Sequence, residues 1–166
     1  MQPGVLIRPS VDADVPRIRD IYNHYVRETV VTFEEEPLGV EEMARRIADV
    51  RKRFPWLVVE ADGVVAGYAY GALWKARSAY RFAIESTIYL APECLGRGYG
   101  RALYTALLEA LRSCDVHRVV GCIALPNEAS VALHEKLGFR KIGIFDQVGR
   151  KFGRWVDVGY WELGLE

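Results

Sequence analysis

The amino-acid sequence predicts an α/β fold in a single domain. Runs rich in β-branched and aromatic residues alternate along the chain with amphipathic runs of helical period. The chain has 166 residues, of which 51% are hydrophobic, so it is long enough to bury one sizeable core. Repeats, low-complexity tracts and linkers are not found, and we expect one domain over residues 1–166.

The first third of the chain predicts a short strand and two helices. Residues 6–8 form the strand, and Asp12 or Asp14 is a suitable N-cap for the helix that follows. Apolar residues recur at helical spacing in this helix: Val15, Ile18, Ile21 and Tyr25. Residues 29–33 form an extended connection, and a second helix covers about residues 40–53.

The rest of the chain alternates strands and helices. Residues 56–61 and 64–73 are two strands joined at Asp62-Gly63, which is a strong hairpin signal. The other expected elements are a strand over 82–90, a helix from about Arg101 that buries Leu103, Leu107 and Leu111, a strand over 117–125, a helix capped by Asn127 and ended by Gly138, and a final hairpin of 142–148 and 155–165 around 149–153.

Composition narrows the class of partner. Lys and Arg number 22 and so do Asp and Glu, so no net charge favours nucleic acid or an anionic membrane. No apolar run approaches the ~20 residues of a membrane span, and residues 1–5 lack the features of a signal peptide. Cys94, Cys114 and Cys122 are odd in number and lack metal-ligand spacing. We therefore expect reduced thiols, no metal and a cytoplasmic location.

A glycine-rich segment, Leu95-Gly96-Arg97-Gly98-Tyr99-Gly100, separates a strand from a helix. Alternate glycines let the backbone approach a ligand closely, and the N–H groups of the next helix favour an anion. A phosphate group is the natural occupant. A dinucleotide-binding fold would place this motif in the first strand–helix–strand unit, and the lysine of a nucleotide-hydrolysing loop is missing.

Glu85 lies inside an apolar, β-rich strand, with Thr87 and Tyr89 on the same face. A carboxylate there is costly unless it is paired or faces a wet cleft. Two interpretations are open: a solvent-facing or ion-paired residue, or a functional base in a cleft.

Two further candidates flank this strand. The loop before it combines cations and aromatic rings, which suits an acceptor bearing a carboxylate or phosphinate: Lys75, Arg77, Tyr80 and Arg81. An ordinary solvated loop is the alternative. His134, one turn before Gly138, is either a structural histidine or a group that exchanges protons near neutral pH.

Several motifs resemble those of a known family. Leu95–Gly100, followed by Asn127 and His134–Phe139, resembles the GNAT superfamily of acetyl-CoA-dependent N-acetyltransferases. The similarity to phosphinothricin N-acetyltransferases extends over nearly the whole chain, through Asn23–Tyr25, Thr32-Phe33, Phe54–Val58, Trp74–Arg77, Glu85–Tyr89, Leu125–Asn127 and Gly149–Trp161. The resemblance implies a GNAT acyl-CoA N-acyltransferase fold, in which helices flank a mixed central sheet with a splayed parallel strand pair.

The resemblance also implies an activity, a cofactor and site residues. Acetyl-CoA would donate its acetyl group to the α-amine of a small acceptor of the phosphinothricin, methionine sulfoximine or methionine sulfone type, with Glu85 and His134 as the catalytic pair. The acceptor site would contain Phe33, Lys75, Arg77, Tyr80, Arg81 and Thr87. Acetyl-CoA would contact Ile88, Tyr89, Leu90, Leu95, Gly96, Arg97, Gly98, Tyr99, Gly100, Arg101 and Asn127.

Two departures from the family pattern stand out: the first removes one polar contact at the cofactor cradle, and the second leaves the exact acceptor open. Leu95 stands where Gln or Arg is usual, and Arg81 replaces an acidic residue, as in relatives that acetylate methionine sulfoximine and sulfone. The alternatives are an acetyltransferase for a protein N-terminus, lysine or other amine, and a non-catalytic acetyl-CoA-binding module. The resemblance further implies a homodimer, in which the aromatic segment Trp155–Trp161 would pack at the interface; the alternative is that this segment belongs to the core.

Overall fold

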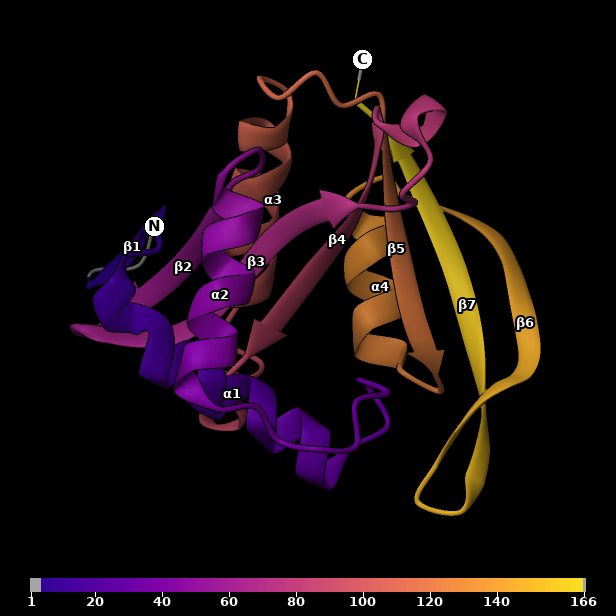
Figure 1. Cartoon of the computed structure of the whole chain (residues 1–166), viewed down its shortest axis with the longest axis horizontal. Helices are drawn as coiled ribbons and strands as arrows, with labels where there is room; N and C mark the ends of the chain where they lie inside the picture. Colours follow the sequence, from indigo (N-terminus) through magenta and orange to yellow (C-terminus); the bar gives the residue numbers. More distant parts are fainter. Residues whose placement is uncertain (1–3, 166) are drawn as a thin grey trace.

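The computed structural model describes residues 4–165, and the start of the segment tested for a signal peptide, residues 1–3, lies outside them. A seven-stranded sheet forms the centre of the molecule, in the order β1-β2-β3-β4-β5-β7-β6 (Figure 1). The strands are β1 (Val5–Pro9), β2 (Trp56–Ala61), β3 (Val64–Leu73), β4 (Ala83–Leu90), β5 (Arg118–Leu125), β6 (Arg140–Lys151) and β7 (Arg154–Gly164). Among the strands of residues 4–165, only β4 and β5 pair in parallel, so the predicted mixed sheet is confirmed.

Helices cover both faces of the sheet. α1 (Val15–Glu28) and α2 (Val40–Arg51) lie on one face, and α3 (Tyr99–Leu111) and α4 (Glu128–Lys136) on the other (Figure 1). Alternate residues of β2 enter the two resulting cores, Val58 under α1 and α2 and Val59 under α3. None of the helices in the described part of the chain is long and apolar enough to span a membrane.

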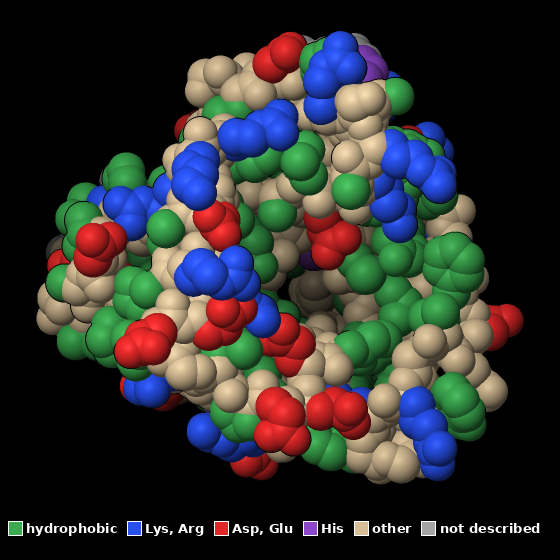
Figure 2. Space-filling model, viewed as in Figure 1, with side chains coloured by type: hydrophobic (Ala, Val, Ile, Leu, Met, Phe, Trp, Pro, Cys, Tyr) green, Lys and Arg blue, Asp and Glu red, His purple; other side chains and the backbone are tan. Residues whose placement is uncertain are grey.

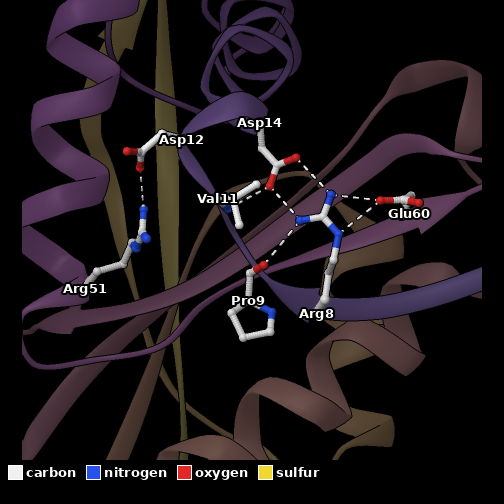
Figure 3. A network of polar contacts seen from close by, with 7 residues as sticks. All are labelled: Arg8, Pro9, Val11, Asp12, Asp14, Arg51 and Glu60. Atoms are coloured by element: carbon white, nitrogen blue, oxygen red, sulfur yellow. Dashed lines mark hydrogen bonds and ion pairs between the residues drawn. The ribbon is translucent and has the colours of Figure 1, made fainter.

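An ion-pair network ties β1 to the elements beside it (Figure 3). The Arg8 guanidinium donates to Asp14 at 2.7 Å and to Glu60 at 2.8 Å. Asp14 stands at the N-cap of α1, as predicted, but its carboxylate accepts hydrogen bonds from Arg8 and the Val11 amide rather than from the helix. The capping interaction expected there is therefore replaced by this network.

The predicted elements are present in the structure, with some boundaries shifted by a few residues; α2, for example, ends at Arg51 rather than at residue 53. The Asp62-Gly63 turn and the Asn127 cap are confirmed, since Asn127 Oδ1 accepts from the amide of Ser130. α3 begins at Tyr99, earlier than the predicted Arg101. The last hairpin turns at Phe152-Gly153, both at positive φ, rather than over 149–153, because a bulge in β6 absorbs the extra residues.

The parallel pair separates at its carboxyl end. In β4, Ala83–Ser86 pair with Arg118–Gly121 of β5. Beyond this point β4 continues along β3 to Leu90, and β5 continues along β7 to Leu125. The last residues of both strands therefore have one edge free. A wedge opens between these edges, and this wedge positions the site.

Candidate active site

A cavity of about 220 Å³ lies where β4 and β5 diverge. Figure 2 shows a hollow near the centre of this face, between the half that carries α1 and α2 and the half that carries β6 and β7. The cavity is lined from the α1–α2 connection, β4, β5, β7 and the region of α4: Val31, Thr32, Phe33, Glu85, Ser86, Thr87, Ile88, Tyr89, Cys122, Ile123, Ala124, Asn127, Ser130, His134 and Val158. The structure thus brings together Glu85, His134, Phe33, Thr87 and Asn127, as the sequence predicted.

Glu85 is the carboxylate in the wall of this cavity. It lies in β4 between Ala72 of β3 and Val120 of β5, within the paired part of the strand. Burial raises the pKa of Glu85 above its usual value, and the positive charge of Lys75 offsets part of that rise. A carboxylate with a raised pKa beside a cavity is suited to accept a proton from a bound amine.

His134 belongs to a buried chain of hydrogen bonds. Its Nδ1–H donates to the carbonyl of Ser130 at 2.8 Å, so Nε2 is the acceptor nitrogen. The Tyr104 hydroxyl, at 3.0 Å, donates to Nε2 and accepts in turn from Ser86 Oγ at 2.6 Å. Burial lowers the pKa of His134, which keeps the imidazole neutral at pH 7. The His134 side chain also lines the cavity, but both of its ring nitrogens are engaged, so its hydrogen-bonded route to the cavity runs through Ser86.

Local sequence explains why the imidazole fits here. A Cβ on Gly121 of β5 would lie 2.6 Å from His134 Cδ2, so the glycine gives the ring room against the strand. Tyr104 and Phe139 pack edge-on or tilted against the ring and each other. The histidine is fixed on all sides rather than free to swing.

Cys122 lines the same cavity on β5. Burial raises the pKa of its thiol, and the charge of Glu85 adds to the rise. The thiol is therefore protonated at neutral pH and is a poor nucleophile. This favours direct attack of an acceptor on a bound thioester over an acetyl-cysteine intermediate.

The four predicted residues of the cationic loop do not line the first cavity. Lys75 and Tyr80 line a second cavity of about 580 Å³, between this loop and strands β6 and β7. Arg77 and Arg81 are exposed and line neither cavity. The Arg81 side chain donates to the carbonyl of Ser78 and stacks on Phe82 instead. Lys75 and Tyr80 thus share one cavity, and Arg77 and Arg81 do not join them there; contact of these four residues with the acceptor stays a prediction.

The glycine-rich segment forms a cradle at the start of α3. Gly96 and Gly98 have φ of +74° and +80°, a region that side chains disfavour, and added Cβ atoms would meet open space. The first helical hydrogen bond runs from the Ala102 amide to the Gly98 carbonyl, which leaves the amides of Tyr99, Gly100 and Arg101 free. Free amides in an open cradle fit a pyrophosphate.

The remaining predicted cofactor residues surround this cradle. Leu95, Arg97 and Arg101 are exposed beside it, and Ile88, Tyr89 and Leu90 form the free end of β4 that leads from Glu85 toward it. The Tyr25 hydroxyl donates to the Leu90 carbonyl at 2.6 Å and fixes this strand end. Within residues 4–165, no group of three or more His, Cys, Asp or Glu side chains is arranged to hold a metal ion.

Sequence reasoning missed Tyr104, Ser86 and Lys151. Tyr104 could have been noticed as the polar member of a buried helix face that otherwise carries leucines. Ser86 alternates with Glu85 and points to the other face of β4. Lys151 gives no local signal, because its partner is a carbonyl 119 residues away in the sequence.

Comparison with known proteins defines the class. The fold and the cradle are those of a GNAT acetyltransferase, and residues 7–159 match the family model described as an acetyltransferase (GNAT) domain. The chain belongs to this family.

Particular relatives are also similar. Phosphinothricin N-acetyltransferase of Streptomyces viridochromogenes is 43% identical over 162 residues, covering 98% of this chain and 88% of that protein. L-methionine sulfoximine/L-methionine sulfone acetyltransferase of Salmonella typhimurium is 36% identical, covering 96% and 94%. The solved phosphinothricin acetyltransferase of Sinorhizobium meliloti, in complex with acetyl-CoA, matches with a TM-score of 0.93 and 35% identity, covering 97% of this chain and 88% of that one.

Proposed function

We propose that this protein transfers the acetyl group of acetyl-CoA to the α-amine of a small amino-acid-like acceptor, of the phosphinothricin, methionine sulfoximine or methionine sulfone type. The observation that carries the proposal is Glu85, a partly buried carboxylate with a raised pKa in the wall of a small cavity at the β4–β5 wedge. The cavity volume, about 220 Å³, suits an amino acid rather than a folded protein segment. The names of the similar relatives support the same acceptor class.

In the proposed mechanism Glu85 removes a proton from the acceptor ammonium, through a water molecule. The free amine then attacks the thioester carbonyl, and a main-chain N–H near Leu90 stabilises the oxyanion that forms. Collapse of the tetrahedral intermediate expels the CoA thiolate. One proton leaves through Glu85, and a second moves from the acetylated nitrogen to the thiolate sulfur.

His134 takes part in this scheme through the chain that ends at Ser86. In this chain Ser86 donates to Tyr104 and Tyr104 donates to His134 Nε2. Ser86, in the cavity wall, can therefore exchange protons with a neutral imidazole that its bond to the Ser130 carbonyl holds in place. We assign His134 this indirect role because a carbonyl and a hydroxyl occupy its two ring nitrogens. Glu85 is the group that acts on the acceptor.

The binding residues follow from the two cavities and the cradle. Phe33 and Thr87 bound the acceptor in the first cavity, and Lys75 and Tyr80 lie beside it to receive its acidic group. Arg77 and Arg81 are left out of this proposal. The cofactor's pyrophosphate would lie on the amides that follow Gly96 and Gly98, with Arg97 and Arg101 beside it, and its pantetheine arm along Ile88–Leu90. When bound, acetyl-CoA supplies the activated acetyl group.

Glu85→Gln tests the mechanism. The amide cannot accept the proton, so kcat should fall by about 10²- to 10⁴-fold, while calorimetry should give an unchanged Kd for acetyl-CoA. Glu109→Gln, on the exposed side of α3, is the matched control. Thiol release should be measured with phosphinothricin, methionine sulfoximine, methionine sulfone, ordinary amino acids and a peptide with a free N-terminus. Unchanged turnover in Glu85→Gln would remove the carboxylate from the mechanism. Preference for the peptide would show that the acceptor is a protein N-terminus rather than a small amino acid.

We also propose that the protein is a cytoplasmic homodimer built from one domain. The three cysteines are free, which suits a reducing compartment. β6 is an edge strand with exposed apolar side chains, among them Ile142 at 51%, Phe145 at 59% and Val148 at 58% exposure, and Figure 2 shows hydrophobic side chains gathered over this region. Such a surface on an edge strand favours self-association. Light scattering of the purified protein would give twice the chain mass.

A further inference from the structure

Two segments from opposite halves of the molecule meet at the mouth of the first cavity. One is the α1–α2 connection, residues 29–39, which carries Thr32 and Phe33. The other is the β6–β7 hairpin, whose end reaches toward this connection in Figure 1. Neither segment belongs to the β4–β5 wedge that holds Glu85. Their contact nevertheless involves Thr32 and Phe33, which form one wall of the cavity.

Lys151 makes the polar part of this contact. Its ammonium donates to the main-chain carbonyl of Thr32 at 2.8 Å. The side chain is only 2% exposed, although Lys is almost never buried without a partner. The bond therefore has the features of a specific, charge-assisted tie between the hairpin and the connection.

Gly149 makes the apolar part. The ring of Phe33 lies against its Cα, so closely that a Cβ at this position would overlap the ring. Gly149 is two residues from Lys151 on the same strand, and both side-chain positions are buried while Val148 and Arg150 are exposed. The hairpin thus holds Thr32 by its carbonyl and Phe33 by its ring face.

The connection is anchored at its other side by α1 and α2. Thr32 Oγ1 contacts the Tyr22 hydroxyl at 2.8 Å, and Tyr22 donates to Glu34 at 2.6 Å. Glu34 pairs with Arg46 of α2 at 2.7 Å. Because these contacts fix the body of the connection, the tie to the hairpin sets the remaining freedom of Phe33.

We propose that Lys151 and Gly149 determine acceptor specificity by clamping Phe33 as a fixed wall of the acceptor pocket. Lys151 is a positioning residue in this scheme, since it acts through Thr32 and Phe33 and not on the substrate. Without the clamp the ring moves outward, small acceptors lose contact with it, and bulkier amino acids gain room. The inference rests on the proposed function for its kinetic part only.

Lys151→Met tests the clamp, because it keeps the unbranched apolar stem of the side chain and removes the ammonium. Losing one charge-assisted hydrogen bond of about 1.4 kcal/mol should raise KM for a small acceptor about tenfold. KM for acetyl-CoA should stay within twofold, and activity toward bulkier amino acids should rise relative to wild type. Arg150→Met, an exposed neighbour on the same strand, is the control and should change neither constant.

Gly149→Ala is the second variant, since it displaces Phe33 while leaving Lys151 intact. It should raise KM for the acceptor in the same way. Hydrogen exchange of residues 29–39 gives a readout that needs no acceptor: their amides should exchange faster in Lys151→Met than in wild type or Arg150→Met. If wild type transfers no acetyl group, the proposed function fails. The exchange rates of residues 29–39 would still show whether Lys151 holds the connection in place. Unchanged exchange, or equal rises in KM for acceptor and acetyl-CoA, would overturn it.

Discussion

Tyr104→Phe tests whether His134 works through its hydrogen-bonded chain. The change removes one hydroxyl from a fully buried side chain on α3 and leaves the ring packed against His134 and Phe139. The contacts to Ser86 and to His134 Nε2, at 2.6 and 3.0 Å, are both lost. Ser86 can then donate its proton to the carbonyl of Val120, 3.4 Å away, whereas Nε2 is left without its donor.

The size of the effect follows from these two bonds. A buried acceptor without a donor costs about 1 to 3 kcal/mol, so the free energy of unfolding should fall by that amount. If the chain also assists the transition state by one hydrogen bond of about 1.4 kcal/mol, kcat should fall about tenfold. KM for acetyl-CoA should not change, because Tyr104 does not line the cavity.

The assay combines thiol-release kinetics, thermal unfolding and the nitrogen NMR signals of His134. In wild type the signals should report a neutral ring with the proton on Nδ1. A double-mutant cycle gives the decisive result: in a His134→Gln background, Tyr104→Phe should have little further effect on kcat. Independent effects of the two changes, or a kcat within twofold of wild type in Tyr104→Phe alone, would refute the chain.

Two further predictions concern pH and stability. The kcat/KM profile should fall on the acid side with a midpoint above the usual glutamate pKa, since burial raises the pKa of Glu85 and its protonation removes the base; Glu85→Gln should abolish this limb. Arg8→Met should lower the free energy of unfolding by about 3 kcal/mol, because it leaves Asp14 buried without its cation. Calorimetry should show the melting temperature lower by about 6 to 12 °C. The Arg8 hydrogen bonds lower the pKa of Asp14 from its usual value of 3.8. The difference in free energy of unfolding between wild type and Arg8→Met should therefore be complete above about pH 4, and it should vanish as the pH falls through the lowered pKa.

Local signals in the sequence predicted most of the fold. Asp62-Gly63 and Asn127 act through their own backbone geometry, so the turn and the cap could be located without tertiary information. The glycines at 96 and 98 likewise report a local conformation, the positive φ that opens the cradle. Predictions of this kind succeeded because the cause and the effect lie within a few residues.

Features that depend on which of several possible partners a side chain meets could not be predicted. The sequence indicates a substrate ligand at Arg81 but does not predict that its side chain donates to the Ser78 carbonyl and stacks on the Phe82 ring. Asp14 was expected to cap a helix, but Arg8 and the Val11 amide compete for its carboxylate. The role of Lys151 follows only from the path of the chain that brings the last hairpin to Thr32.

The sheet itself explains why the site lies where it does. β4 stays paired with β3 up to Leu90, and β5 stays paired with β7 up to Leu125, so neither strand end frays when the two part. Their facing edges carry main-chain N–H and C=O groups that need partners, and an extended ligand with its own amides can supply them. This wedge separates the two halves of the sheet at the carboxyl ends of β4 and β5, where the cavity lies. The clamp of Lys151 and Gly149 on the α1–α2 connection joins those halves again on the far side of the cavity, and this gives an otherwise open wedge a fixed acceptor wall.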